Sequence, residues 1–586
     1  MPGDLERIRK LSRRRDLVGC DEMSAANALQ VATFLLVVTL LVKPVGAYLE
    51  QVFERRHTIL DWLLVPLERL IHQLVGVCPE REMDWRHYSL GFGIFSLVNV
   101  VLLYLALRWQ AWLPWFFPDS MTTPMTSDLA ANTAVSFVTT TTWQAYGGET
   151  TMSYFSQLLL AGENFLAGAA GLAVGIAFIR GYAREQTTGI GNFWADLIRA
   201  ILWVLLPVSV VGSLFLTWQG VPMNFLPYSI VHTVEGGTQT IAQGPVATLE
   251  FIKNLGTNGG GFFNANGAHP FENPTALTNF IELLAIVVIP AAFTHTFGRM
   301  TGRTRDGWVI FWTMTALFVA GLLVCGWAEG RVHPSFAHEI SGGNMEGKEV
   351  RFGVGGSVLA AVVTSNGATG SYNAMHDSFQ PLGVLVPLLN MLLGEIVYGG
   401  LGSGFYSMIF VVLMALFIGG LMVGRSPEHI GQRLGPPEMK IIVAYTLLGP
   451  CTVLLLTALA VVTEAGRAGL TTNTGPHGFT EILYAYASAL ANNGQTMAGL
   501  SANSVFYNLT TIIAMLVGRY GLAVLALALA GRFAGVSRRP PSPGSVPSDG
   551  VLFGVLLGAT ALLVGAMSFL PALALGPILE HFCMRM

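Results

Sequence analysis

Ten long apolar runs constrain the fold of this chain more than any other feature of its sequence. A membrane-spanning helix needs about 20 mostly apolar residues, and the stretches that qualify are 26–42, 89–107, 152–179, 197–218, 276–297, 308–327, 381–424, 441–463, 505–531 and 551–575. Charged residues make up only 11% of the chain, against about 25% in soluble proteins. The sequence therefore predicts an all-α polytopic membrane protein with about ten transmembrane helices.

The run at 381–424 is too long for one crossing and too short for two crossings joined by a proper loop. Its middle reads GGLGSG, and a glycine-rich segment of this kind breaks a helix inside the bilayer. We therefore count the run as one interrupted helix. Gly399, Gly400, Gly402 and Gly404 permit the dihedral changes that move a loop, so this segment is a candidate gate.

A second unusual stretch, NLGTNGGGFFNANGAHPFENPT at 254–275, lies between two apolar runs but cannot itself be a membrane helix. Polar, irregular backbone survives at membrane depth only where it is buried in protein or lines a watery path. Exposed carbonyl oxygens can replace the hydration shell of a cation. Taken alone, the stretch is equally compatible with an ordinary loop outside the membrane.

Similar polar turns occur at four places, each after a helix-compatible segment between two apolar runs. From Thr140 to Asn258, Thr369 and Asn493 they recur at roughly 110–125 residues, and a fixed period indicates repeated structural units. We predict four pseudo-symmetric membrane–pore-loop–membrane units around one pore. They cover 89–179, 197–297, 308–424 and 441–531, with a first transmembrane helix and loop at 23–88 and a last helix at 551–586. An oxygen lining suits a monovalent cation better than an anion.

Basic residues predict the orientation, because short cytoplasmic loops carry an excess of Lys and Arg. Alternate loops hold most of them: Arg55, Arg56, Arg69, Arg81, Arg86, Arg180, Arg184, Arg299, Arg303, Arg305, Arg425, Arg433, Lys440, Arg532, Arg538 and Arg539. With these loops in the cytoplasm, the four polar turns and both termini lie outside. The Arg-rich residues 5–15 would then be on the wrong side, which favours Met23 as the true start and 1–22 as an extension. The alternative is a secretory signal cleaved near 45–47.

Other classes of function lack support in the sequence. No GxxxxGK[ST] loop is present, so the chain has no P-loop for a nucleotide. The five cysteines are scattered, which disfavours a disulfide framework or a zinc site. The net charge of −3 gives no nucleic-acid signature. We expect no catalytic residues, so any ATP hydrolysis that drives the protein belongs to another subunit.

The motifs TNGGGFFNAN, HPFENPT, NAMHDS, GPHGF, ANNG and AGLSANS resemble those of the KdpA family. This family is the potassium-binding, channel-like subunit of the Kdp potassium-transporting P-type ATPase, and the similarity extends over nearly the whole chain from Ala25 onward. It implies the fold of the superfamily of potassium transporters, with K⁺ as the transported ion. It also implies a location in the bacterial inner membrane, a KdpB-like catalytic subunit that binds ATP, and small KdpC-like and KdpF-like membrane subunits.

The resemblance also implies which residues form the selectivity filter. Carried over by motif, these are Thr139, Thr140, Thr141, Thr142, Thr257, Asn258, Gly259, Ala368, Thr369, Gly370, Ser371, Asn492, Asn493, Gly494 and Gln495. The chain departs from the family where Thr140 and Thr142 stand at positions that usually hold Asn. Tyr372 stands where a small apolar residue is usual. The sequence therefore leaves potassium affinity and potassium-over-sodium discrimination open.

Two charged residues within apolar runs are candidates for a role below the filter, because charges at membrane depth are costly. Arg519 resembles a positive residue that related transporters place there to oppose direct passage; the alternative is a structural partner for a carboxylate. Glu395 would either cap the broken helix through its dipole or attract ions leaving the filter. We hypothesise that both residues and Gly399–Gly404 obstruct the direct route and send ions sideways to the ATPase subunit.

Several other polar residues have structural interpretations. Glu163, Asn164 and Glu282 are expected in buried hydrogen-bonded pairs or at headgroup level. His376 and Asp377 are expected to fix a loop rather than to bind a metal, because no second His–carboxylate pair is expected nearby.

The leading functional hypothesis is a subunit that selects external potassium and passes it to an ATPase partner. A stand-alone potassium or sodium channel, or an ion-coupled transporter of the same superfamily, is the alternative. A third class is a receptor or scaffold with a blocked pseudo-pore, supported only by the missing Asn residues of the first filter segment.

Overall fold

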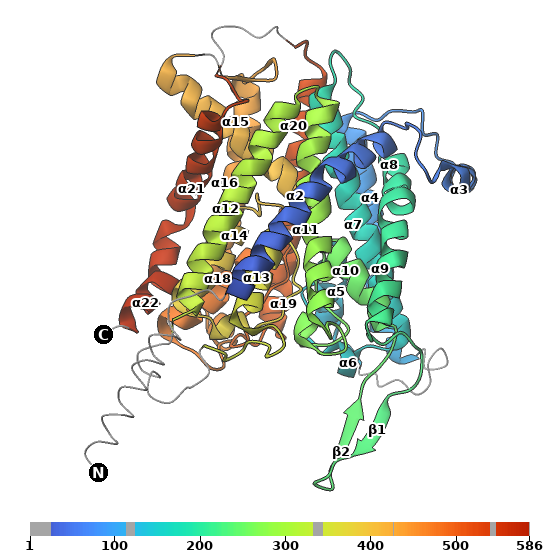
Figure 1. Ribbon diagram of the computed structural model, residues 1–586, viewed down its shortest axis with the longest axis vertical. Coiled ribbons are helices and arrows are strands. Elements are labelled where there is room, and N and C mark those ends of the chain that lie inside the picture. Colours follow the sequence, from blue (N-terminus) through green and yellow to red (C-terminus); the bar gives the residue numbers. More distant parts are fainter. Residues whose placement is uncertain (1–24, 113–123, 332–343, 426, 539–545, 585–586) are drawn as a thin grey trace.

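The computed structural model describes residues 25–112, 124–331, 344–425, 427–538 and 546–584. Within these residues ten helices are long and apolar enough to cross a membrane, and they run along the long axis of the molecule (Figure 1). They are α2 (Ala25–Phe53), α4 (Trp85–Arg108), α7 (Tyr154–Ala183), α8 with α9 (Phe193–Trp218), α11 (Ala276–Met300), α12 (Thr304–Glu329), α15 (Ser403–Val423), α16 (Pro436–Val462), α19 with α20 (Val505–Ala534) and α21 with α22 (Val551–Cys583). The prediction of an all-α membrane protein with about ten spans is therefore confirmed. The extension predicted at 1–22 lies outside the described residues.

Four shorter helices lie between pairs of long ones along the chain: α5 (Ser127–Val138), α10 (Val246–Leu255), α13 (Gly353–Asn366) and α18 (Gly475–Ala491). At 1.5 Å per residue none reaches the roughly 30 Å of a bilayer core. Each packs against the long helices that flank it in sequence, as α5 does against α4 and α7. All four lie in the same half of the molecule (Figure 1).

The run at 381–424 forms two helices, α14 (Pro381–Leu392) and α15, with 393–402 between them. The interruption is packed against α7 by small residues. A Cβ on Gly171 would lie 2.7 Å from the carbonyl oxygen of Leu401, and one on Gly175 would overlap Gly402. Small residues allow this close backbone approach between membrane helices, so α7 holds the broken segment at the centre of the bundle.

Three long helices contain π-helical segments. These are η3 (Ala200–Leu205) between α8 and α9, η7 (Val517–Gly521) between α19 (Val505–Leu516) and α20 (Leu522–Ala534), and η8 (Ala574–Ile578) between α21 and α22. Segments of this kind inside α-helices often occur at functional sites. The one in η7 contains the candidate residue Arg519.

The remaining elements lie at the two ends of the bundle. An antiparallel hairpin, β1 (Ser229–His232) and β2 (Thr238–Ile241), pairs Ser229 with Ile241 and projects from the end where the described chain begins and finishes (Figure 1). The opposite end carries α3 (Asp61–Val75) and the short β3–β4 pair (Glu428–His429 and Gln432–Arg433). Single turns complete the fold: η1 (Gln110–Trp112), α6 (Gly148–Thr151), η4 (Asn266–Ala268), η6 (His376–Ser378) and α17 (Glu464–Arg467).

Candidate functional site: a ring of four loop segments

Each of the four short helices ends directly before one of the predicted filter segments. One or two residues after α5, α10 and α13, and immediately after α18, the backbone enters the left-handed region. The residues there are Thr140 (φ 63°), Thr257 (φ 50°), Ala368 (φ 51°) and Asn492 (φ 57°). Because non-glycine residues with positive φ are uncommon, their recurrence at matched positions indicates the same local turn in all four units.

The four segments contact one another in a closed cycle. A Cβ on Gly494 would overlap the carbonyl oxygen of Thr141, which joins the first and fourth segments. A Cβ on Gly370 would lie 2.8 Å from the Asn493 oxygen, which joins the fourth and third. The Gly370 amide donates to the Asn258 carbonyl at 3.1 Å, which joins the third and second.

The cycle closes between the second and first segments. A Cβ on Gly260 would lie 3.1 Å from the carbonyl oxygen of Thr142. Gln144, just beyond the first segment, accepts from the Gly261 amide at 3.0 Å and donates to the Gly261 carbonyl at 3.1 Å. Each of the four segments therefore contacts two of the others, and the structure brings the four predicted filter segments together.

Two residues after each first left-handed position stands the matched set Thr142, Gly259, Gly370 and Gly494. Three of these also have positive φ: Thr142 at 47°, Gly259 at 122° and Gly494 at 90°. Glycine adopts such angles without steric cost, whereas for a β-branched threonine they are an outlier. The buried Thr142 hydroxyl has no hydrogen-bond partner within the described residues.

Most side chains of the ring bond to the surrounding scaffold. Asn493 donates to the Thr364 carbonyl at 3.0 Å and to Glu395 at 2.8 Å. Asn492 donates to the Met515 carbonyl at 3.0 Å and also to the Thr141 hydroxyl of the first segment at 3.0 Å. The Thr257 hydroxyl accepts from the Leu401 amide at 3.0 Å, which ties the second segment to the helix interruption. These bonds engage the side chains of Asn493, Asn492 and Thr257 with other parts of the protein.

A buried charged cluster supports the second segment from behind. Lys253 lies 2.5 Å from Glu250 and 3.6 Å from Glu272, and all three side chains are fully buried. Glu272 accepts from the amides of Phe262 and Phe263 at 2.7 and 3.2 Å. The cluster therefore holds the backbone that leaves Gly259–Gly261.

Arg519 and Glu395 lie on the side of the ring that faces the helix interruption. Arg519 is buried, donates to the Ala167 carbonyl at 2.8 Å, and lies about 3.0 Å from where a Cβ on Gly171 would stand. Glu395 accepts from Asn493 of the fourth segment, and α15 has no side-chain cap. The observed partner of Glu395 is thus the ring and not a helix N-terminus.

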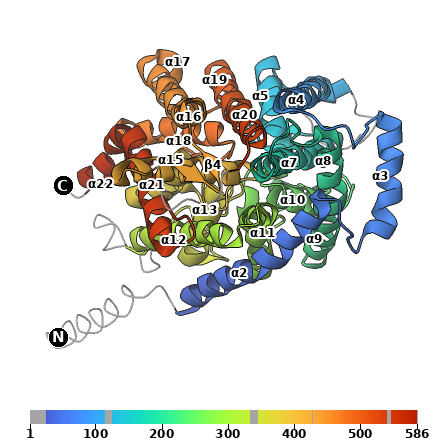
Figure 2. The ribbon, with the colours of Figure 1, turned by 90° about the horizontal axis from the view of Figure 1, so that it is seen from above.

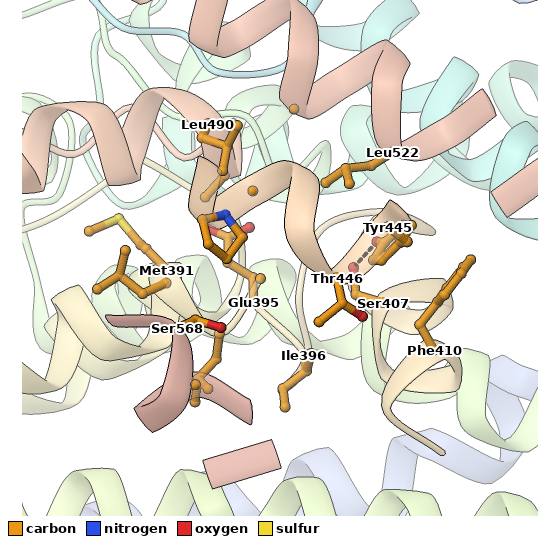
Figure 3. Close-up of a pocket in the computed structure, with 18 of the residues that line it drawn as sticks. Met391, Glu395, Ile396, Ser407, Phe410, Tyr445, Thr446, Leu490, Leu522 and Ser568 are labelled. Atoms are coloured by element: carbon orange, nitrogen blue, oxygen red, sulfur yellow. Dashed lines mark hydrogen bonds between the residues drawn. The ribbon is translucent and has the colours of Figure 1, made fainter. Parts of the chain in front are cut away.

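Both residues line a cavity of about 130 Å³ between α15, α16, α18 and α21. Figure 3 shows Glu395 near the apolar side chains of Met391 and Leu490, with Phe410 on the opposite side of the pocket. Ser407 and Tyr445, hydrogen-bonded at 2.6 Å, supply hydroxyl groups on the far wall (Figure 3). The cavity therefore begins at the ring, with one carboxyl group and one guanidinium group near its start, and continues between largely apolar helices.

His376 and Asp377 lie outside the ring. His376 contacts the Tyr484 hydroxyl at 2.8 Å, and Asp377 lies 3.0 Å from Nε2 of His477. The expectation that Asp377 has no histidine–carboxylate pair nearby is wrong, because His477 and Glu481 both lie beside it. His477 contacts Glu580 through Nδ1 at 2.7 Å. Burial alone lowers the pKa of His477, but its bonds to Asp377 and Glu580 raise it to about 10, so an imidazolium cation satisfies these partners.

The other polar residues singled out in the sequence are buried. Glu163, Asn164 and Glu282 lie inside the protein. The carbonyl of Asn164 lies 3.0 Å from the Asn258 side chain, which donates to it in its favoured orientation. Tyr372 is half-buried, with its hydroxyl 3.3 Å from that of Thr496. Its ring therefore packs behind the third segment.

Comparisons with known proteins agree on one family. The family model described as "Potassium-transporting ATPase A subunit" (KdpA) matches residues 32–582. A protein of Methylorubrum extorquens is 50% identical over 562 residues, covering 96% of this chain and 98% of its own length. One from Granulibacter bethesdensis is also 50% identical over 566 residues, covering 96% and 99%. Both are named potassium-transporting ATPase potassium-binding subunit.

A solved structure is similar in fold. The potassium transporter TrkH from Vibrio parahaemolyticus superposes with a TM-score of 0.51 at 13% sequence identity, covering 87% of this chain and 99% of that one. At this level of identity the likeness concerns the arrangement of the helices alone.

Proposed function

This chain belongs to the family of potassium-transporting ATPase A subunits, and from that premise we propose that it is the potassium-binding and translocating subunit of an ATP-driven uptake complex. The observation that carries the proposal is the closed cycle of four backbone segments. A ring of carbonyl oxygens around one axis suits a dehydrated monovalent cation. The relatives at 50% identity carry the name of a potassium-binding subunit.

The proposed filter consists of Thr139–Thr142, Thr257–Gly259, Ala368–Ser371 and Asn492–Gln495. Its electrostatics support a cation, because four helices end at the ring and a helix C-terminus carries about half a negative charge. Since scaffold bonds occupy Asn492, Asn493 and Thr257, backbone carbonyls are the proposed ligands. The presence of Thr140 and Thr142 at positions that hold Asn in the family then alters backbone strain and leaves the ligand atoms unchanged.

Below the filter, we propose that Arg519, Glu395 and Gly399–Gly404 block the direct path. The positively charged guanidinium group of Arg519 repels a potassium ion that leaves the filter, because charges close together inside the protein are only weakly screened. The Glu395 carboxyl group, bonded to Asn493, offers a departing ion a partner at the start of the cavity. Ions would leave sideways through this cavity toward the subunit that hydrolyses ATP.

The finer assembly is also a proposal. A KdpB-like P-type ATPase subunit binds the ATP, and KdpC-like and KdpF-like subunits complete the complex in the bacterial inner membrane. The ring faces outside, because the arginine-rich connections lie at the opposite end of the bundle and basic loops stay in the cytoplasm. The described chain ends lie at the ring's end of the bundle (Figure 1), so they would also be outside.

The test is potassium-dependent ATP hydrolysis by the purified complex, with and without Gly259→Asp. A side chain there overlaps Gly370 and adds a charge to the ring, so potassium activation weakens strongly while ATP binding by the partner is unaffected. Potassium activation equal to that of the unmutated complex would exclude the ring as the filter.

The stand-alone channel or ion-coupled transporter makes a different prediction for the isolated chain. Reconstituted into vesicles without partners, it would conduct potassium down a gradient at a high rate. The subunit hypothesis expects slow flux from the isolated chain and co-purification with a P-type ATPase. A scaffold with a blocked pore would give no potassium stimulation of the complex at all.

A further inference from the structure

The helix α3 is amphipathic with its apolar face directed away from the protein. Trp62, Leu70 and Leu74 are 77%, 51% and 77% exposed, whereas Glu68 and His72 are buried. A surface helix of a globular protein normally turns its apolar stripe toward the core. In α3 this arrangement is reversed, so the apolar face has no protein partner within the described residues.

Specific polar contacts hold α3 in this orientation. Glu68 forms two hydrogen bonds with Arg199, at 2.8 and 3.1 Å. Arg199 also donates to the Val52 carbonyl at 2.6 Å. Asp61, at the start of the helix, lies 3.4 Å from the indole nitrogen of Trp203. Rotation of α3 to bury its leucines would break this buried ion pair, so the outward apolar face is a built feature of the fold.

The position of α3 indicates what covers that face. It lies at the arginine-rich end of the bundle, along the outer edge beside α8 (Figures 1 and 2). It has 15 residues, about 22 Å of helix, which is too short to cross a bilayer. α3 packs against α8 and η3, and η3 continues along the chain into α9 (Leu206–Trp218), which exposes apolar side chains over its length, including Val211 at 69% and Leu214 at 66%. The face of α3 is therefore continuous with a surface that must contact lipid.

The charge pattern agrees with a lipid headgroup region. Arg69 is the one exposed charged side chain among the residues of α3, all of which are described. Arg56 and Arg81 are also exposed in the connection between α2 and α4, which carries the exposed acidic residues Glu54, Glu80 and Glu82 as well. Basic residues at a membrane surface attract anionic lipids, and tryptophan is enriched at headgroup level.

We propose that α3 lies in the plane of the membrane interface, with Trp62, Leu70 and Leu74 among the acyl chains and Arg69 on the phosphate of an anionic lipid. Interfacial helices of this kind bury their apolar face about 5–10 Å into the headgroup–acyl boundary. Lipid is favoured over a protein partner by the continuity with α9. The helix thereby anchors the connection between α2 and α4 to the bilayer.

The test is site-specific photo-crosslinking in the complete complex, reconstituted in vesicles of equal phosphatidylethanolamine and phosphatidylglycerol. Benzoylphenylalanine replaces Leu70 in one sample and Glu80 in a control, since the Glu80 side chain is 86% exposed in a polar loop. Mass spectrometry is expected to find acyl-chain adducts at position 70 and few or none at position 80. A crosslink from position 70 to another subunit, or no lipid adduct there, overturns the proposal.

A second arm tests the charge. Among lipid adducts at position 70, phosphatidylglycerol is expected to exceed its share of the vesicle by about twofold or more. Adding Arg69→Gln should return the adducts to the bulk ratio while leaving their total amount unchanged. An identical lipid ratio with and without Arg69 would remove the assignment of Arg69 to an anionic headgroup.

Discussion

Gly259 and Gly370 face each other across the boundary between the second and third segments, with no room for a side chain at Gly259. A Cβ there would overlap the backbone nitrogen of Gly370, whose N–H donates to the neighbouring Asn258 carbonyl at 3.1 Å. These residues are far apart in sequence. Their contact couples the positions of carbonyl oxygens in two different units of the ring.

Gly259→Ala should raise the potassium concentration for half-maximal ATPase activity by roughly tenfold or more, because overpacking displaces backbone at a cost of about 1–3 kcal/mol. Potassium titration of the purified complex measures this. Gly302→Ala is the matched control, since Gly302 also has positive φ (72°) but open space around its Cβ position. Equal shifts in both variants would mean that backbone strain, and not the ring contact, causes the effect.

Thr142→Asn should stabilise the protein by about 1 kcal/mol, because asparagine tolerates the left-handed region better than a β-branched residue. The midpoint of thermal unfolding of the purified complex is expected to rise by about 1 °C or more. Thr139→Asn provides the control, because Thr139 has an ordinary φ of −87°. A fall in the Thr142→Asn midpoint would show that the threonine methyl group packs favourably there.

Lys253→Met should destabilise the chain by about 3–5 kcal/mol, because it leaves Glu250 and Glu272 buried without their cation. The midpoint of thermal unfolding and the potassium affinity should both fall, since Glu272 holds the backbone after Gly261. Adding Glu250→Gln removes one of the unpaired charges and should recover part of the stability. Lys440→Met, at an exposed residue, should change little. An unchanged unfolding midpoint and an unchanged potassium affinity in Lys253→Met would contradict the role of the cluster.

His477 should make stability depend on alkaline pH. Its pKa in the folded state is about 10, above the ordinary value of about 6.5, because Asp377 and Glu580 bind the protonated ring. The raised pKa contributes stability fully below about pH 6.5, and that contribution disappears as pH rises through 10. The unfolding midpoint should therefore fall between these values in the unmutated protein and fall less in His477→Gln. If the unfolding midpoints of the unmutated protein and of His477→Gln fall in parallel with rising pH, His477 does not cause the pH dependence.

Arg519→Gln should increase passive potassium flux through the isolated chain by roughly tenfold, because it removes a positive charge that is weakly screened inside the protein. Flux into potassium-free vesicles measures the effect. Arg532→Gln is a suitable control, because Arg532 pairs with Glu438 and is 44% exposed. If Arg519 only supports the Ala167 carbonyl structurally, stability will fall without any gain in flux.

The sequence predicted the spans well because their signal is local. Runs such as 89–107 and 441–463 contain enough apolar residues in succession to identify a crossing without knowledge of any neighbour. The recurrence of polar turns after Thr140, Asn258, Thr369 and Asn493 also required only spacing. The hairpin β1–β2 and the orientation of α3 were not predicted, because they depend on pairings between short segments with weak local signals.

For the candidate site too, the sequence predicted the local features and missed the contacts between distant elements. The spacing of the polar turns located the four segments, and the motif resemblance indicated their filter residues and their ion. The sequence left Glu395 between two roles, because the partners of a charge are decided by contacts between distant elements. Asp377 pairs with His477, which lies 100 residues later in the chain. The sequence around neither residue predicts this pairing.

By itself, the sequence determined that this chain crosses a membrane about ten times and carries four related polar turns, since hydrophobic length and period are properties of consecutive residues. Only the tertiary structure decided that those turns close into one ring, that Glu395 bonds to that ring, and that α3 turns its leucines outward. The reason is physical: buried polar groups must find partners, and the partner that each one finds depends on which segments the packed helices bring together.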